Sequence, residues 1–314
     1  PVMESFLFAL GMIVAFIPEG LLPAVTLSLA LAVQKMAKHN ALVKKLSAVE
    51  TLGCTNVICS DKTGTLTQNE MTVNHLWNLR AEMTVSGEGY APQGEIRDGD
   101  TVVTVKNSNA LRLLLTGAAL CSNAKLLPPE EGKDRYTVLG DPTEACLGVV
   151  AQKGGIDMDA LNQITPRVME LPFDSRRKRM TTIHQLRERF EGTSRIAFVK
   201  GAPKEVMELC ERCYDGTSSR PINDEDRKRI MQANDTYARD GLRVLAVAYR
   251  PLRREDETLP ESIREYTPEN VERDLTFLGL VAMQDPPRSE VKDAVALCRS
   301  AGIKIIMITG DYGL

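Results

Sequence analysis

Long apolar runs and short apolar patches divide this chain into parts of different kinds. The longest run, Phe6 to Val33, covers 28 residues, and its only charged residue is Glu19. As one helix it would rise about 42 Å, which exceeds the roughly 30 Å hydrocarbon core of a bilayer. Four lysines follow between positions 35 and 45, and such a flank is typical of the cytoplasmic side. The pattern predicts a transmembrane helix over residues 1–34 and a cytoplasmic stalk helix over 35–53.

The apolar run is interrupted at Pro18 and Glu19. Proline donates no backbone hydrogen bond and therefore frees a carbonyl one turn earlier. An ionisable side chain near the middle of a membrane is costly and is usually functional. Unwound carbonyls beside a carboxylate would suit a hard cation. The alternative is a proline-kinked helix whose glutamate is protonated or paired.

Short apolar runs predict a second kind of structure, a Rossmann-type α/β domain in two pieces. Val57–Ser60 is expected to be a buried strand, and so are Leu278–Met283 and Ile303–Thr309, with a helix over 289–301 between the last two. Strand, helix and strand in this order are typical of a βαβ unit. We therefore predict one domain from residues 54–75 and 278–314, interrupted by a large insertion.

The insertion, residues 76–277, has a mixed α+β pattern. Residues 84–106 alternate between polar and apolar around glycines, which predicts short antiparallel strands. We expect a helix over Ala110–Ser122, another from Pro142 through Val150 with Asp141 as its cap, and paired strands at Met180–Ile183 and Arg195–Val199. Residues 251–274 are charged and contain prolines, and we expect a solvated connection there.

The composition of the chain limits the kinds of molecule that it is expected to bind. The 314 residues carry a net charge of −3 and have 43% hydrophobic residues, so no basic face for a nucleic acid is expected. The seven cysteines are scattered, which is typical of a reducing compartment. Cys210 and Cys213 form a lone CxxC pair, and without a second pair or a nearby histidine we interpret it as incidental.

The candidate for covalent chemistry is Asp61, at the carboxyl end of the first predicted strand. An aspartate there can act as a nucleophile and form an aspartyl-phosphate. Lys62 supplies a cation beside it, and Thr63 offers a hydroxyl and backbone groups to a phosphoryl group. Thr309, Gly310 and Asp311 form a second strand-end turn that could face the first. The plainer alternative for both segments is an ordinary turn that closes a strand.

The insertion offers a candidate nucleotide pocket. Phe173 stands beside a run of basic residues, and an exposed aromatic ring next to cations suits an adenine with its phosphates. Lys200 follows a predicted strand and precedes Gly201–Pro203, so it should project from a tight turn. The alternative is a core phenylalanine next to a solvated basic run.

Six motifs occur along the chain in a recognisable order. They are PEGLLP at 18–23, DKTGTLTQNEMTV at 61–73, GDPTEA at 140–145, KGAP at 200–203, DPPR at 285–288 and TGD at 309–311. In this order they resemble the P-type ATPases, cation pumps that phosphorylate an aspartate from ATP, and most closely the type II branch of calcium and sodium/potassium pumps. The resemblance covers essentially the whole chain and favours a haloacid-dehalogenase-like fold for the phosphorylation domain.

The resemblance implies roles for individual residues, with ATP and Mg²⁺ as cofactors. Asp61 would take the phosphoryl group, the carbonyl of Thr63 would help to hold Mg²⁺, and Thr309, Gly310 and Asp311 would contact phosphate and nucleotide. The implied nucleotide residues are Phe173 under the adenine, Glu144 at its amino edge, Lys178 and Lys200 in the pocket, and Arg243 at the phosphates. The implied ligands of the transported cation are the carbonyls of Val14, Ala15 and Ile17 with the carboxylate of Glu19. Ser175 stands where the calcium pumps carry an arginine, so that role is not assigned.

The function that follows is ATP-driven cation transport by an integral membrane protein whose phosphorylation and nucleotide-binding domains lie in the cytoplasm. Ca²⁺ is favoured, and Na⁺/K⁺ or H⁺ pumps of the same family are alternatives. The family's GDGxND loop, actuator domain and other transmembrane helices do not occur in the sequence. We therefore expect a fragment that binds nucleotide without turning it over. A phosphatase of the haloacid dehalogenase type and a non-catalytic nucleotide-binding or membrane-tethered module are the remaining alternatives.

Overall fold

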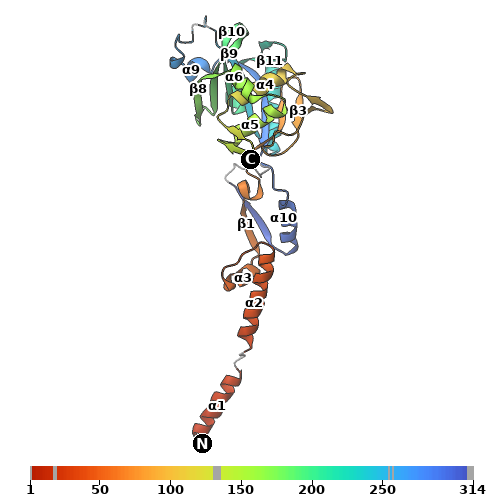
Figure 1. Cartoon of the computed structure of the whole chain (residues 1–314), viewed down its shortest axis with the longest axis vertical. Coiled ribbons are helices and arrows are strands. Elements are labelled where there is room, and N and C mark those ends of the chain that lie inside the picture. Colours follow the sequence, from red (N-terminus) through yellow and green to blue (C-terminus); the bar gives the residue numbers. More distant parts are fainter. Residues whose placement is uncertain (1, 17–19, 130–135, 254, 257, 310–314) are drawn as a thin grey trace. The chain divides into compact units, whose positions relative to one another are not determined.

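The computed structural model describes residues 2–16, 20–129, 136–253, 255–256 and 258–309 (Figure 1). By their internal contacts the residues fall into two compact units. The small unit holds residues 2–61 with Ser289–Ile308, and the sheet unit holds Lys62–Arg288 with Thr309. Each unit is described by itself.

The first part of the small unit is helical. It contains α1 (Val2–Phe16), α2 (Leu21–Lys38) and α3 (Leu46–Gly53). The stalk was expected to be one helix over 35–53, but α2 ends at Lys38 and α3 begins only at Leu46. Asn40 has a positive φ of 61°, a conformation that leaves the right-handed helix and that asparagine tolerates better than most residues. The predicted end of the stalk at Gly53 coincides with the end of α3.

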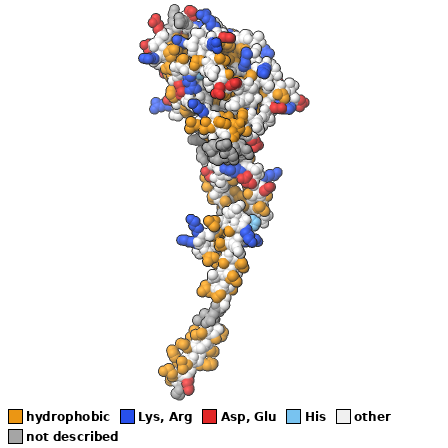
Figure 2. Space-filling view, viewed as in Figure 1, with side chains coloured by type: hydrophobic (Ala, Val, Ile, Leu, Met, Phe, Trp, Pro, Cys, Tyr) orange, Lys and Arg blue, Asp and Glu red, His pale blue; other side chains and the backbone are white. Residues whose placement is uncertain are grey.

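By length and composition alone, one helical stretch, Val2–Lys38, is apolar enough to cross a membrane, with a mean hydropathy of 2.0. A signal sequence near the N-terminus would meet the same criterion. Its apolar side chains are not buried inside the protein, and Figure 2 shows hydrophobic side chains exposed along this stretch. The predicted interruption at Pro18 and Glu19 lies outside the described residues.

The remainder of the small unit is a two-stranded parallel sheet with one helix. β1 (Val57–Asp61) pairs with β15 (Lys304–Ile308), and α10 (Val291–Ser300) precedes β15. Both strands occur where the apolar runs predicted them, but the expectation that they are buried is wrong. Ile306 is 40% and Ile308 54% exposed, because a parallel sheet becomes buried only when further strands and helices cover it, and a pair of strands with one helix leaves most of its surface open.

The sheet unit is built on an eleven-stranded sheet whose described strands are mostly antiparallel. From one edge to the other, its main path runs through β5 (Thr101–Val103), β4 (Ile96–Asp98), β3 (Glu82–Val85), β2 (Thr72–Trp77), β14 (Leu275–Gln284), β13 (Arg243–Pro251), β10 (Thr193–Gly201), β9 (Arg179–Phe190) and β8 (Arg167–Asp174). Off this path, β11 (Cys210–Tyr214) pairs in parallel with the start of β14 and antiparallel with β12 (Ser219–Pro221).

The position of β14 corrects the predicted domain organisation. The run Leu278–Met283 was expected to lie in a βαβ unit with β15, yet β14 lies between β2 and β13 and pairs antiparallel with both. Nine of its ten residues are buried, as expected for a central strand covered on both faces. An apolar run predicts a strand but does not specify its partners, and here β2 and β14 both belong to the sheet that was assigned to the insertion.

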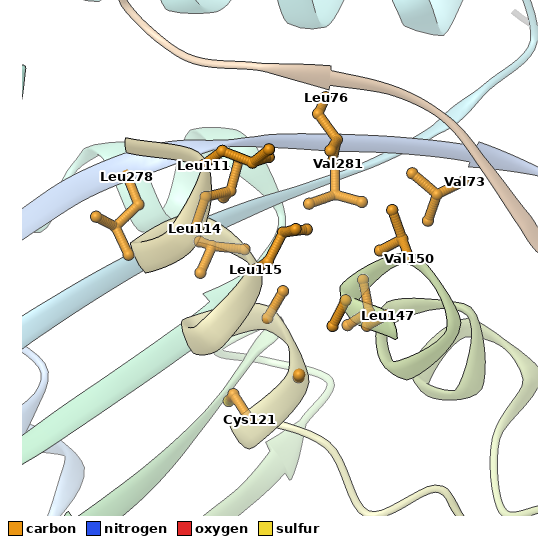
Figure 3. Close-up of a cluster of buried hydrophobic side chains, with 14 of the residues drawn as sticks. Val73, Leu76, Leu111, Leu114, Leu115, Cys121, Leu147, Val150, Leu278 and Val281 are labelled. Atoms are coloured by element: carbon orange, nitrogen blue, oxygen red, sulfur yellow. The ribbon is translucent and has the colours of Figure 1, made fainter. Parts of the chain in front are cut away.

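Two helical layers cover the two faces of this sheet. On one face, α4 (Asn109–Leu120) and α5 (Pro142–Lys153) pack against sheet residues such as Leu76 and Val281 (Figure 3). On the other face, α7 (Pro203–Met207) and α8 (Asp224–Arg239) pack around Trp77 and Phe277. Neighbouring strand residues alternate between the two clusters, as Ala246 and Val247 do, because successive side chains of a strand point to opposite faces.

Several expectations for the insertion are confirmed. Pro142 is the first residue of α5, and the Asp141 side chain accepts a hydrogen bond from the Thr143 amide, although the helix continues beyond Val150 to Lys153. The predicted strand pair is β9 and β10, with Thr182 opposite Phe198. The other described elements are α6 (Met158–Ile164), β6 (Lys125–Leu127), β7 (Thr137–Leu139), α9 (Pro268–Val271) and the 3₁₀ turn Ile263–Glu265.

The segment 251–274 is less solvated than its charge pattern predicted. Leu252, Tyr266 and Val271 are buried against β8, β9 and β10. Glu272 is also buried, because two arginines and a threonine hydroxyl neutralise and solvate its carboxylate. Charged residues in a sequence therefore do not by themselves indicate exposure when opposite charges lie within reach.

Candidate functional site

The sheet unit contains a cavity of about 710 Å³ at the ends of β10 and β13. It is lined by Asn123, Asp141, Thr143, Glu144, Phe173, Lys178, Lys200, Gly201, Ala202, Arg243, Val244 and Leu245. The structure thus brings together all five residues that the resemblance named for the nucleotide within the insertion, Glu144, Phe173, Lys178, Lys200 and Arg243. They come from α5, from β8 and the turn after it, and from β10 and β13.

The turn between β8 and β9 supplies Phe173 and Lys178. The Asp174 carboxylate accepts hydrogen bonds from the backbone amides of Arg177 and Arg176 at 3.1 and 2.7 Å, and these bonds lower the pKa of Asp174. Lys178 has a positive φ of 50°, which reverses the chain direction. Phe173 is 63% exposed, as predicted for a residue that presents its ring to a ligand.

Lys178 and Lys200 differ in their surroundings. Lys178 Nζ lies 2.6 Å from Glu205 Oε1 at the start of α7 and is largely exposed, and this hydrogen bond lowers the pKa of Glu205. Lys200 is buried, and its Nζ lies 2.7 Å from Glu144 Oε1. The other carboxylate oxygen of Glu144 accepts a 2.6 Å hydrogen bond from the Asn123 amide. The lining of the cavity therefore includes one buried ion pair and one largely exposed lysine.

Gly201 allows the two cationic segments to approach each other. A Cβ atom at this position would lie 2.5 Å from the Lys178 carbonyl oxygen and 2.5 Å from Arg179 Cβ, closer than real Cβ contacts. The Ala202 amide also donates a 3.0 Å hydrogen bond to the Lys178 carbonyl. The glycine of the KGAP motif is thus explained by close backbone packing beside the cavity.

Arg243 lies at the first position of β13, and its Nη1 donates a 2.9 Å hydrogen bond to Thr143 Oγ1. Thr143 lies in the first turn of α5, where the Asp141 side chain caps the helix. The GDPTEA motif therefore both begins α5 and contributes three lining residues, Asp141, Thr143 and Glu144. Its proline suits the first helical turn, where no backbone donor is needed.

Sequence reasoning missed a supporting group of residues, Asn123, Arg167 and Glu170. Asn123 Nδ2 lies 2.9 Å from Glu170 Oε1, and Arg167 contacts both side chains and the carbonyls of Leu120 and Ser122. This group fixes the end of α4, from which the Asn123 amide reaches Glu144. Asn123 is 44 and 47 positions away from Arg167 and Glu170, so no local pattern could have identified the group.

Asp61 is the last residue of β1, in the small unit. It lies opposite Ile308 in the parallel register, so the carboxyl ends of β1 and β15 meet at one edge. Its side chain is exposed. Thr309 follows β15 directly in the sequence, whereas Gly310 and Asp311 lie outside the described residues. The pairing of the two strands agrees with the predicted neighbourhood of the DKTG and TGD motifs.

Lys62 and Thr63 begin a tight turn, Lys62–Leu66, in which Gly64 has a positive φ of 75°. The Arg288 side chain donates hydrogen bonds to the carbonyls of Gly64 and Thr65 at 3.0 and 3.1 Å. Asp285 accepts a hydrogen bond from the Thr67 hydroxyl and one of 3.1 Å from the Glu70 amide. The two ends of the DPPR motif therefore hold the DKTGTLT turn in shape, a role that the sequence alone did not reveal.

The predicted cation ligands are only partly described. Val14 and Ala15 lie in the last turn of α1, where backbone carbonyls have no partner within the helix. Ile17 and Glu19 lie outside the described residues. Among residues that the structure describes, no three His, Cys, Asp or Glu side chains gather closely enough to hold a metal ion.

Comparison with known proteins places the chain in a family. Residues 110–290 match the family model of "P-type ATPase, cytoplasmic domain N". The chain is 41% identical over 98% of its length to the calcium-transporting ATPase of Bacillus subtilis, and 40% identical over 98% to the probable cation-transporting ATPase F of Mycobacterium tuberculosis. It is 39% identical over 99% to calcium-transporting ATPase 1 of Lactococcus lactis. It spans about a third of the length of these relatives (33%, 32% and 31%).

Proposed function

Because the chain belongs to the P-type ATPase family, we propose that it forms the nucleotide-binding and phosphate-accepting part of an ATP-driven cation pump. The observation that carries this proposal is the cavity of the sheet unit. Glu144, Phe173, Lys178, Lys200 and Arg243 are separated by up to 99 positions in the sequence, yet all five line it.

The lining of the cavity suits both halves of a nucleotide. Phe173, Val244 and Leu245 offer apolar surface to a base, and an aromatic ring can stack on any base. The Lys200–Glu144 pair places a donor and an acceptor side by side, which matches the mixed hydrogen-bonding edge of adenine. Lys178 and Arg243 contribute positive charge for the phosphates. Their present partners, Glu205 and Thr143, lie at or near the surface and could be exchanged for phosphate oxygens.

We propose further that Asp61 is the phosphate acceptor, in a haloacid-dehalogenase-like, Rossmann-type domain to which β1 and β15 belong. A carboxylate oxygen of Asp61 would attack the γ-phosphorus of ATP, the bond to the bridging oxygen would break, and ADP would leave with the electron pair. Mg²⁺, which neutralises the phosphate charge when bound, would be held by the Asp61 carboxylate and the Thr63 carbonyl. The parallel register of β1 and β15 supports this assignment, because ligands of α/β sheets gather at the carboxyl ends of strands.

The transported ion is proposed to be Ca²⁺, with Na⁺/K⁺ or H⁺ as the alternative. Two of the relatives reported above are named calcium-transporting ATPases. The Val14 carbonyl supports a cation site, because its helical partner would be the amide of residue 18, and Pro18 has none. With Ala15, Ile17 and Glu19 it would form an oxygen-rich site inside the bilayer, and the sheet unit would lie in the cytoplasm.

Calorimetric titration of the full chain in detergent with ATP tests the nucleotide site. Phe173→Ala and Lys200→Gln should each weaken ATP binding about tenfold or more, since one base–aromatic stack is worth about 1–3 kcal/mol. Lys204→Gln is the matched control: it removes the same charge from an exposed lysine that does not line the cavity, and it should leave affinity unchanged. Equal affinity in all four proteins would contradict the proposal.

A further inference from the structure

We propose that Glu272 is a positioning residue for nucleotide binding, although it does not line the cavity. It follows the short helix α9 and is 3% exposed. Its Oε1 accepts hydrogen bonds from Arg177 Nη1 at 2.5 Å and from Thr181 Oγ1 at 2.7 Å, and its Oε2 accepts one from Arg179 Nε at 2.6 Å. Glu272 thereby joins a remote segment to both sides of the turn that carries Lys178.

The connection continues from Arg177 to Phe173. While one guanidinium nitrogen of Arg177 binds Glu272, the other donates a 2.7 Å hydrogen bond to the Pro172 carbonyl. Pro172 directly precedes Phe173 in the chain. The backbone that presents the aromatic ring is therefore held through Arg177 by a buried negative charge.

The second arginine holds the other side of the turn. Arg179 Nη1 donates a 3.1 Å hydrogen bond to the Arg177 carbonyl, and its Nε binds Glu272. Lys178, with its positive φ, lies between the two arginines. Without the carboxylate, two neighbouring guanidinium groups would repel each other across this turn, and an aromatic ring that is 63% exposed has little packing of its own to keep it in place.

The backbone that precedes Glu272 is held by buried contacts. Arg250, 4% exposed, donates hydrogen bonds to the carbonyls of Asn270 and Val271 at 2.6 and 3.3 Å, and Val271 packs in the cluster with Leu171 and Ile183. The residues that precede Glu272 are thus held against the sheet by contacts that do not involve Arg177 or Arg179. Binding sites keep their geometry when such supporting groups lock the residues that touch the ligand.

The inference rests on the proposed nucleotide function, and titration of the full chain with ATP tests both. Glu272→Gln keeps the shape and removes the charge, and it should weaken ATP binding about tenfold through a displaced Phe173. In the Phe173→Ala background, Glu272→Gln should weaken ATP binding much less than it does alone, because the ring through which it acts is gone. Asp226→Asn is the control. It removes the charge of a buried carboxylate in α8 that pairs with Arg220, and it should destabilise the sheet unit without changing its affinity for ATP.

Three outcomes decide the inference. Reduced affinity in Glu272→Gln that vanishes in the Phe173→Ala background supports it. Unchanged affinity in Glu272→Gln, with binding still weakened by Phe173→Ala and Lys200→Gln, overturns it and leaves the proposed function intact. Unchanged ATP affinity in both Phe173→Ala and Lys200→Gln overturns the inference and the proposed function together. Should Glu272→Gln fail to fold, Arg177→Ala, at a side chain that is 21% exposed, must show the same loss and the same dependence on Phe173.

Discussion

β14 and β15 are both runs of apolar residues, and they differ completely in their surroundings. β14 lies in the middle of the large sheet, with Leu280 and Val281 fully buried between two helical layers. Among the described residues β15 pairs only with β1, and Met307 is 56% exposed. The comparison teaches that an apolar run predicts a strand, whereas burial depends on how many other elements fold against it.

The same difference separates the two candidate sites. The cavity of the sheet unit is lined by described residues from strands and helices that are distant in the sequence. Asp61 is the last residue of β1 in a two-stranded sheet, and its side chain is exposed. Affinity for nucleotide is therefore expected to reside in the sheet unit, and covalent chemistry at the edge of the small unit.

An identical substitution in each unit would sharpen this comparison most strongly. Ile196→Ala in β10 removes a fully buried side chain and should lower the free energy of unfolding by about 2–5 kcal/mol. Ile306→Ala in β15, at a 40% exposed position, should change it by less than about 0.5 kcal/mol. Hydrogen exchange of the full chain followed by mass spectrometry, which reports on β10 and β15 separately, measures both. Equal losses would show that the small unit is packed as tightly as the large sheet.

The free energy of unfolding of the sheet unit should depend on pH through the imidazole of His184. His184 is buried in β9, with Nδ1 3.0 Å from the Thr165 carbonyl and Nε2 2.9 Å from Thr182 Oγ1. Burial, assisted by the positive charge of Arg167, lowers the pKa of His184 from 6.5 to about 4. The unfolded chain binds this proton more readily, so the stabilising contribution is present above pH 6.5 and is lost as the pH falls towards 4, to a total of about 3 kcal/mol.

Urea unfolding at a series of pH values checks this prediction. His184→Gln should flatten the dependence between pH 6.5 and 4 that this residue contributes. His39→Gln, at the exposed end of α2, should leave the dependence of the sheet unit unchanged. If His184→Gln retained the full pH dependence, carboxylates rather than this imidazole would be responsible.

Much of the local structure followed from the sequence. Asp141 and Pro142 predicted the start of α5 because capping and proline chemistry act within one turn, and the glycine-punctuated alternation predicted β3 to β5. The partners of β14 could not be predicted, since antiparallel and parallel neighbours impose the same apolar pattern on a central strand. The end of the helix at Lys38 was not predicted, because residues 39–45 carry no proline or glycine that would mark it.

The candidate site was predictable where motifs are short and unpredictable where contacts span the chain. Glu144 of GDPTEA and Lys200 of KGAP, which the resemblance named for the nucleotide, both line the cavity. Asn123, Arg167 and Glu272 were not foreseen, because each acts through a partner between 21 and 95 positions away. Glu272 in particular lies in a segment whose charge suggested a solvated linker.

The most direct test of the account is phosphorylation of the full-length pump that is proposed to contain this chain, with Asp61→Asn compared with the unaltered protein. After incubation with ATP labelled at the γ-phosphate and Mg²⁺, the unaltered pump should carry an acid-stable label that hydroxylamine removes, as expected for an acyl phosphate. Asp61→Asn should carry none and should still bind ATP with unchanged affinity. Full labelling of Asp61→Asn would contradict the account.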